Sequence, residues 1–476
     1  MRHYCNFLPL AVRLAYDARQ PATAAPRKLD ANDRMSNQKL PRVLRFSDLV
    51  LLTVGSVIGS GIFVVPATVL TQTGGQLGLA LFVWVAGGIL SLLGALAYAE
   101  LAAMKPESGG IYVFIRDAFG SSVAFLYGWA LFLVIATATV ATLAVAFSAY
   151  LRELVPLSPL AMKAVSVLMI IAIAAINALG TRRSANLQNW TTAIKVGAIL
   201  LMSVLLLARG DGLNEMSVAL PELEGSILMA LGAAMLGVLW AYEGWHYITF
   251  SAGEVIDPQT NFPRGIIVGT VALIGIYLLA NIAYVAALGV QRSAASERIA
   301  AEAVAAILGP GAGKLIALAI LISMFSAANA VVLTSTRVYF AMARDGHFFE
   351  RMGSIHARWQ TPAFAIVASC AWAAVLAMSG TFEQLLTYVV FTGWAFYALG
   401  AASIFYYRRR APDAPRPFRV PGYPWTPLIF VLVAAAIVLN TVLLHPGQTA
   451  IGVALVLLGV PVYWFWRRNA RRPIAT

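Results

Sequence analysis

The chain has 476 residues, of which 60% are hydrophobic and 12% are charged, and its mean hydropathy is +0.78. This composition excludes a soluble fold of that length, because so few polar residues could not cover its surface. The net charge of +13 does not indicate a nucleic-acid partner, since no basic patch is interleaved with exposed aromatic residues. The chain is therefore expected to be a membrane protein with many spans.

Twelve apolar runs follow one another, each long enough to cross a bilayer, which takes about 17 to 25 residues. They lie at 49–70, 78–104, 121–150, 161–180, 186–208, 226–256, 264–290, 313–343, 361–379, 382–407, 427–444 and 449–466. Residues 1–41, which precede them, lack the apolar core and cleavage site of a signal peptide. We expect this segment to be a disordered cytoplasmic tail.

The distribution of Lys and Arg predicts the orientation of the spans. An even number of spans places both termini on one side, which carries 27 of these residues, whereas the other side carries six and Lys195 lies inside a span. Positive residues concentrate on the cytoplasmic side, so both termini are expected to be cytoplasmic, in the plasma (inner) membrane. The two cysteines, Cys5 and Cys370, provide neither a disulfide framework nor a thiolate metal site, and no cofactor or metal is predicted.

Two of the runs are interrupted in their middle, the first at Gly59–Gly61 and the sixth at Ala241–Gly244, about 180 residues later. Lipid cannot satisfy unpaired peptide groups, so an interrupted helix at membrane depth must line a cavity. Such a pair of breaks is typical of the midplane binding site of secondary transporters with inverted repeats. We therefore expect two five-span halves of opposite orientation.

This repeat divides the rest of the chain. The ten-span core is predicted at 42–407, a Pro-rich basic cytoplasmic loop at 408–426, two additional spans at 427–466 and a cytoplasmic C-terminal tail at 467–476. The fold class is all-α, integral to the membrane, with twelve transmembrane helices.

The first break suits the zwitterion of an amino acid. Gly59–Gly61 permits close approach of a ligand to the backbone, and the half-helix restarting at Ile62 would direct its amides and positive end at a carboxylate. The preceding carbonyls, at Ser56–Ile58, suit an ammonium group. The alternative is that Gly55 and Gly59 form only a small-residue packing face.

The second break contains an acid, Glu243, whose charged form costs about 2.5–3.5 kcal/mol at the centre of a span. It could bind a proton, a substrate ammonium or a neighbouring cation, or it could be half of a structural ion pair. Burial favours the protonated form. Trp240 could cover a substrate side chain, and the alternative is an ordinary core aromatic.

Lys195 is the other charge deep in an apolar run. Beside backbone carbonyls it could stand where Na⁺ would sit and link the first span to the hydroxyl-bearing stretch Ser323–Asn329. The alternative is a lysine that extends its amine to the membrane surface.

Several motifs, in order along residues 42 to 466, resemble the amino acid–polyamine–organocation superfamily, and most closely its L-type amino acid transporter branch. They are Gly59–Phe63, Pro106–Tyr112, Ala241–Trp245 with Glu254 and Asn261–Pro263, Ser335–Arg337 with Ala343–Gly346, Thr361–Pro362, and Arg416–Pro421.

The resemblance implies a LeuT-type inverted repeat and alternating access. It places the substrate carboxylate on the amides of Ser60, Gly61 and Ile62, and the ammonium on carbonyls around Val57, Ile58 and Trp240. It also assigns Lys195 as the residue that replaces a cation. The full predicted substrate site is Val57, Ile58, Gly59, Ser60, Gly61, Ile62, Trp240, Ala241, Glu243 and Gly244, and the predicted coupling residues are Lys195, Ser323 and Ser326.

The chain departs from the family pattern at two places. Glu243 stands where the family usually has Asp or Gly, which bears on side-chain preference. Members linked to a heavy chain carry a cysteine between the third and fourth spans, whereas Leu151–Ala161 contains none, so no disulfide-linked heavy chain is expected.

These observations predict a Na⁺-independent secondary transporter that exchanges L-amino acids, neutral ones in particular. The alternatives are proton-coupled symport of amino acids or polyamines, with Glu243 or Lys195 carrying the proton, and a transport-inactive amino acid sensor. An enzyme is not expected, since the spans contain no nucleophile–base pair.

Overall fold

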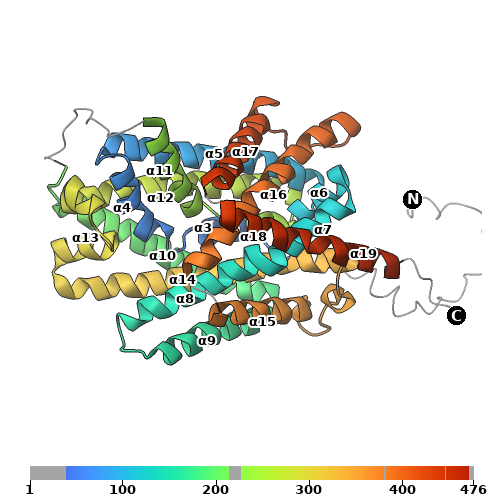
Figure 1. The fold of residues 1–476 in the computed structure, drawn as a ribbon, viewed down its shortest axis with the longest axis horizontal. Coiled ribbons are helices and arrows are strands. Elements are labelled where there is room, and N and C mark those ends of the chain that lie inside the picture. The colour runs from blue at the N-terminus through green and yellow to red at the C-terminus, as the bar shows by residue number, and fades with distance from the viewer. Residues whose placement is uncertain (1–38, 214–226, 380–381, 445, 471–476) are drawn as a thin grey trace, which may run out of the picture. The chain divides into compact units, whose positions relative to one another are not determined.

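The computed structural model describes residues 39–213, 227–379, 382–444 and 446–470. Within these residues every regular secondary-structure element is a helix, which confirms the all-α class (Figure 1). The only β-type pairing among them is an isolated bridge between Leu44 and Val255. Most of the predicted N-terminal tail and the end of the predicted C-terminal tail lie outside the described residues.

The helices follow the predicted apolar runs. The first half contains α3 (Phe46–Val57), α4 (Gly61–Gln72), α5 (Leu77–Met104), α6 (Ile111–Phe119), α7 (Ser121–Ala130), the π-helix η2 (Leu131–Ile135), α8 (Ala136–Arg152), α9 (Pro159–Ala178) and α10 (Thr181–Arg209). The second contains α11 (Ile227–Ala241), η3 (Trp245–Glu254), α12 (Pro258–Ala294), α13 (Ile299–Leu308), η4 (Pro310–Ala312), α14 (Gly313–Arg344), η5 (Glu350–Gly353), α15 (Ala363–Ser379) and α16 (Phe382–Arg410). The last three are α17 (Trp425–Leu444), α18 (Pro446–Leu457) and α19 (Gly459–Ala470).

Length and apolar composition identify eight membrane-crossing helices among the described residues, and nine when the bent pair α3 and α4 counts as one. The other three predicted runs correspond to α11, α15 and α16. Of these, α11 has 15 residues and α15 has 17.

The two interrupted spans differ in how they break. Helices α3 and α4 meet at an angle of 51°. The sixth run breaks at the predicted position and continues after Gly244 as η3, a 3₁₀ helix of ten residues. Its turn begins at Gly244 with φ +120°, a conformation that glycine adopts without a steric penalty.

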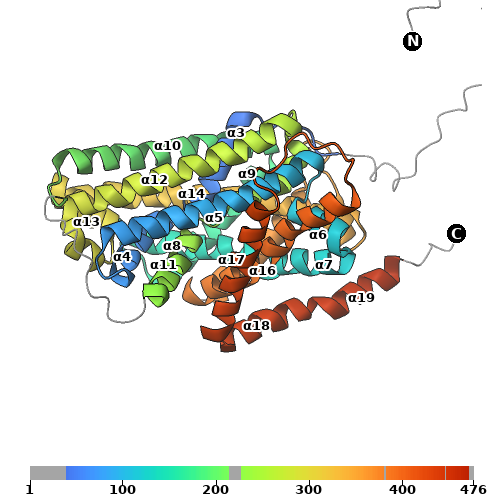
Figure 2. The same cartoon turned by 90° about the horizontal axis from the view of Figure 1, so that it is seen from above.

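Long helices enclose the breaks. Helices α5, α12 and α10 run alongside one another, with α12 in contact with both of the others and with α3 (Figure 2). Helices α8, α9 and α15 form another mutually packed group (Figure 1), and α14 packs against α8, α10 and α3. The breaks are therefore covered by protein rather than by lipid, as unpaired peptide groups require.

The 27 Lys and Arg residues counted on the predicted cytoplasmic side include Arg337, and this placement is wrong. Arg337 lies inside α14 and is fully buried, with its Nε donating to Glu254 Oε1 at 2.6 Å and its Nη2 donating to Thr181 Oγ1 at 2.8 Å. A buried charge is tolerated when paired and hydrogen-bonded in this way. The count on the predicted cytoplasmic side falls by one, which leaves the predicted orientation unchanged.

Candidate functional site

The two breaks touch each other. The Ser56 hydroxyl donates to the carbonyl of Gly244 at 3.0 Å. The Tyr277 hydroxyl donates to the carbonyl of Ala241 at 2.8 Å, and Val57 O lies 3.4 Å from the same hydroxyl. The backbone of both breaks is therefore held in one place by side chains that the site prediction did not include.

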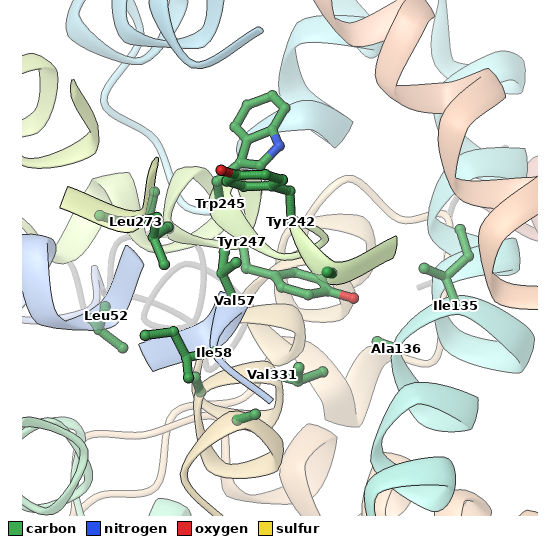
Figure 3. Close-up of a cluster of buried hydrophobic side chains, with 14 of the residues drawn as sticks. Leu52, Val57, Ile58, Ile135, Ala136, Tyr242, Trp245, Tyr247, Leu273 and Val331 are labelled. Atoms are coloured by element: carbon green, nitrogen blue, oxygen red, sulfur yellow. The ribbon is translucent and has the colours of Figure 1, made fainter. Parts of the chain in front are cut away.

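A cavity of about 60 Å³ lies at this junction. Its lining comes from Ser56, Val57, Gly59, Ser60, Gly61, Thr139, Thr142, Leu143, Trp240, Ala241, Glu243, Tyr247, Ala327 and Val331. Figure 3 shows part of the apolar surroundings, with Val57, Tyr247 and Val331 contributed by three different elements. Seven of the ten predicted substrate residues line the cavity, whereas Ile58, Ile62 and Gly244 do not.

The amide end of the first break has the geometry of an anion site. Helix α4 begins at Gly61, and Ser60 before it makes no side-chain hydrogen bond to the helix start. The first amides of a helix have no intrahelical partner, and the positive end of the helix favours a negative charge beside them. Ser60 and Gly61 both line the cavity, so these amides stand where a carboxylate could reach them.

The carbonyl end of the first break is bound by Lys195. Its Nζ donates to Ile58 O at 2.6 Å and to Gly55 O at 2.7 Å, and the residue is only 1% exposed. The alternative of a lysine extending to the membrane surface is therefore wrong. Ser323 Oγ donates to Ile58 O at 2.9 Å and to Gly59 O at 3.0 Å.

These contacts bear on the predicted ammonium site. A carbonyl oxygen has two lone pairs, and Ile58 O already receives Lys195 and Ser323. A substrate ammonium at this end would therefore need other acceptors on the cavity wall.

Ser326, the third predicted coupling residue, lies in a different network. Its Oγ accepts from Gln188 Nε2 and contacts Thr191 Oγ1, both at 3.0 Å. Gln188 also accepts from Asn329 Nδ2 at 2.9 Å. The structure thus brings Ser323 to the break together with Lys195, while Ser326 ties α14 to α10.

Glu243 lines the cavity, and its carboxyl group has an aromatic partner. Tyr397 of α16 donates to Glu243 Oε1 at 2.7 Å. Among the residues that the structure describes, the one basic side chain within 4 Å of this carboxyl is His246, with its Nε2 at 3.9 Å from Oε1. Glu243 and Lys195 are therefore held by separate groups rather than by each other.

Sequence reasoning missed the wall contributed by α8 and α14. Thr139, Thr142 and Leu143 come from α8, and Ala327 and Val331 come from α14. Threonines three residues apart share a face of a helix, so the pair in the third apolar run was a usable signal. The two apolar residues of α14 gave none, because they are indistinguishable from ordinary core positions.

Gly61 has a different neighbour from the one expected. A Cβ added to this residue would lie 2.9 Å from both Cα and Cβ of Ala241. The missing side chain therefore lets the two broken spans approach each other, in addition to any room it leaves for a ligand. At Gly59 the added Cβ would meet Leu143 and Ala327 at 3.7 and 3.8 Å, which is ordinary contact with the cavity wall.

Comparisons with known proteins agree with this architecture. The family model described as amino acid permease matches residues 44–465. The mouse large neutral amino acids transporter small subunit 2 is 32% identical over 431 residues, which cover 88% of this chain and 80% of the relative. The serine/threonine exchanger SteT of Bacillus subtilis is 29% identical over 421 residues, which cover 88% of this chain and 95% of the relative. The human cystine/glutamate transporter is 31% identical over 432 residues, which cover 89% of this chain and 85% of the relative.

Proposed function

Because the chain belongs to the amino acid permease family, a family of multi-pass membrane transporters and not of enzymes, we propose that it exchanges neutral L-amino acids without Na⁺. The family match confirms the resemblance drawn from the motifs. The proposed location is the plasma (inner) membrane, with both termini in the cytoplasm.

The observation that carries this proposal is the position of Lys195. Its amine occupies the carbonyls of Gly55 and Ile58 at 2.7 and 2.6 Å, at the end of a half-helix whose negative end attracts a cation. In transporters of this architecture, such unwound carbonyls are where a coupling Na⁺ binds. A fixed amine in that place removes the need for the ion.

The preference for neutral substrates is supported by Glu243 and by the relatives. The carboxyl lies in a largely apolar cavity with Tyr397 as its hydrogen-bond donor, and low polarity favours the uncharged form of an acid. An uncharged carboxyl gives a cationic side chain no particular advantage. One relative is named for large neutral amino acids, and another is named as an exchanger of serine and threonine.

A second candidate, proton-coupled uptake, is favoured by the same carboxyl. Ionisable groups at membrane depth that face a cavity are typical of proton relays, and Glu243 is such a group. Uptake by this route would be driven by an inward proton gradient and would not require an amino acid inside the vesicle.

Flux into liposomes separates these functions. The purified protein is reconstituted with or without internal alanine or leucine, and uptake of the labelled amino acid is followed in Na⁺ or choline medium. We expect rapid uptake only into loaded vesicles, at the same rate in both media. Uptake into empty vesicles that follows an imposed proton gradient would favour symport, and steep Na⁺ dependence would contradict the role given to Lys195.

We also propose that transport needs no disulfide-linked heavy chain. The segment between α8 and α9 contains no cysteine, although one relative is named a small subunit. The liposome assay with this single chain tests the point directly, since transport by the chain alone would be lost if a partner were required.

A further inference from the structure

A basic pocket lies away from the substrate cavity, where α9 ends and α10 begins. It encloses about 340 Å³ and is lined by Pro41, Val43, Leu179, Gly180, Thr181, Arg182, Arg183, Arg358, Trp359 and Gln360. Three of these residues are arginines and none is acidic. We propose that this pocket binds the phosphate of an anionic phospholipid headgroup.

Two of the three arginines in the pocket have no acidic partner among the described residues. Arg182 pairs with Asp48 and also donates to Val43 O at 3.1 Å. Arg183 and Arg358 are exposed, and in the part of the chain that the structure describes neither has an ion-pair partner. The guanidinium groups of these two residues therefore have N–H donors available for a ligand in the pocket. A guanidinium group binds phosphate through two parallel hydrogen bonds.

The backbone adds to this positive potential. Helix α10 has 29 residues and begins at Thr181, with Gly180 before it making no side-chain cap. The first amides of a helix have no intrahelical partner, and the first three residues of α10 are among those that line the pocket. The helix start alone would not define a site, and the argument rests on its coincidence with two unpaired arginines and an enclosed volume.

The apolar surface below the pocket indicates a lipid rather than a soluble anion. Arg183, Trp190, Ile194 and Leu201 are separated by 7, 4 and 7 residues, so they lie on one face of α10. The last three are 72%, 50% and 62% exposed. Arg183 therefore lies at the N-terminal end of an apolar stripe along a membrane-spanning helix. A lipid would place its phosphate at that end and its acyl chains along the stripe.

Lipid binding by the purified full chain tests the proposal. Native mass spectrometry titrations compare phosphatidylglycerol with zwitterionic phosphatidylcholine for the wild type, for the double variant R183Q/R358Q and for a control, R351Q/R409Q. The control removes two exposed arginines elsewhere on the predicted cytoplasmic side and changes the net charge equally. Size-exclusion profiles establish that each variant is folded.

We expect the wild type to prefer phosphatidylglycerol, and R183Q/R358Q to weaken its binding by about 30-fold, as the loss of two surface arginines predicts. The control should retain the wild-type affinity, and phosphatidylcholine binding should be unchanged in all three proteins. Equal phosphatidylglycerol affinity in the two double variants would overturn the proposal.

Two further arms identify the source of the phosphate. Excess inorganic phosphate or glycerol 3-phosphate should not displace phosphatidylglycerol, because neither can use the apolar stripe. Displacement by these anions would instead indicate a soluble-anion site. Trp190→Ala should weaken binding of the long-chain lipid, and an unchanged affinity in this variant would contradict the placement of the acyl chains along α10.

Discussion

The two breaks solve the same backbone problem with different chemistry. At the first break, the peptide groups themselves are available for binding. Lys195 and Ser323 donate to its carbonyls, and the amides at the start of α4 have no side-chain cap. At the second break, Ser56 and Tyr277 bind the carbonyls, and the group that reaches the cavity is a side chain, Glu243.

We propose that this difference separates general recognition of the substrate from specificity for its side chain. Backbone amides and carbonyls can bind only what every amino acid shares, the carboxylate and the ammonium. A side chain at the second break can change by substitution without disturbing the first break. Variants of the first break should therefore affect all substrates alike, whereas variants of the second should affect substrates selectively.

The largest expected effect is that of Lys195→Ala at the first break. The substitution removes a buried donor from two carbonyls, and each unsatisfied buried group costs about 1–3 kcal/mol. Ile58 O keeps its bond from Ser323, so the loss falls mainly on Gly55 O. We expect exchange of every substrate to fall by roughly 100-fold, with a smaller effect on equilibrium binding, because we propose that the lysine links spans that move during transport.

Lys163→Ala is the matched control, since Lys163 is an exposed lysine on α9. Flux and binding are measured in the same vesicle preparation. Loss of exchange for one class of substrate only, with the others unaffected, would contradict the general role of the first break.

The next largest effect is expected where the breaks touch. In Gly61→Ala the new Cβ would lie 2.9 Å from the Cα of Ala241, so the half-helix must shift, which costs about 1–3 kcal/mol. All substrates should lose about tenfold or more in transport rate. Gly59→Ala provides the comparison, since its Cβ would meet the side chains of Leu143 and Ala327 and the carbonyl oxygen of Val57, all at ordinary distances.

We expect Gly59→Ala to retain transport of alanine and to lose transport of larger substrates such as phenylalanine, because the methyl group narrows the cavity. A panel of competing amino acids measures both variants. Equal losses for alanine and phenylalanine in Gly59→Ala, or a fully active Gly61→Ala, would show that the glycines have been assigned the wrong neighbours.

The sequence was informative where physics leaves few choices. Lipid cannot satisfy unpaired peptide groups, so the interruptions at Gly59–Gly61 and Ala241–Gly244 predict a cavity. Lys195 is recognisable because it is a charged residue inside an apolar run. The π-helix η2 could not be predicted, because its five residues are as apolar as those of the α-helices on either side. The 3₁₀ segment η3 mixes apolar residues with His246, Ser251 and Glu254, a composition that does not distinguish a 3₁₀ helix from an α-helix. Tyr277 and Val331 were missed for a related reason: a tyrosine or valine in a span has many roles, and only the packing of distant helices decides which it takes.

A smaller and selective effect is expected at the second break. Glu243→Gln keeps the size of the side chain and an oxygen that can accept from Tyr397, so neutral exchange should be retained within a few-fold. Wild type should prefer alanine or leucine to lysine or arginine near neutral pH. If wild type instead prefers arginine and the variant loses that uptake alone, Glu243 is a charged substrate ligand and the protein is a carrier of cationic amino acids.

The smallest effect, and the one that sharpens the comparison most, is the coupling between Glu243 and Tyr397. Hydrogen bonds between neutral groups contribute about 0.5–1.5 kcal/mol, whereas those to charged groups contribute about 1.5–3 kcal/mol. Tyr397→Phe, Glu243→Gln and the double variant form a cycle that isolates this pair, with the exchange rate of leucine as the readout. Because we propose an uncharged carboxyl, we expect a coupling energy in the lower range that does not change between mildly acidic and mildly alkaline vesicles. A coupling energy in the upper range that falls on acidification would mean that Glu243 is ionised during transport, and the second break would then recognise substrates by charge as well as by shape.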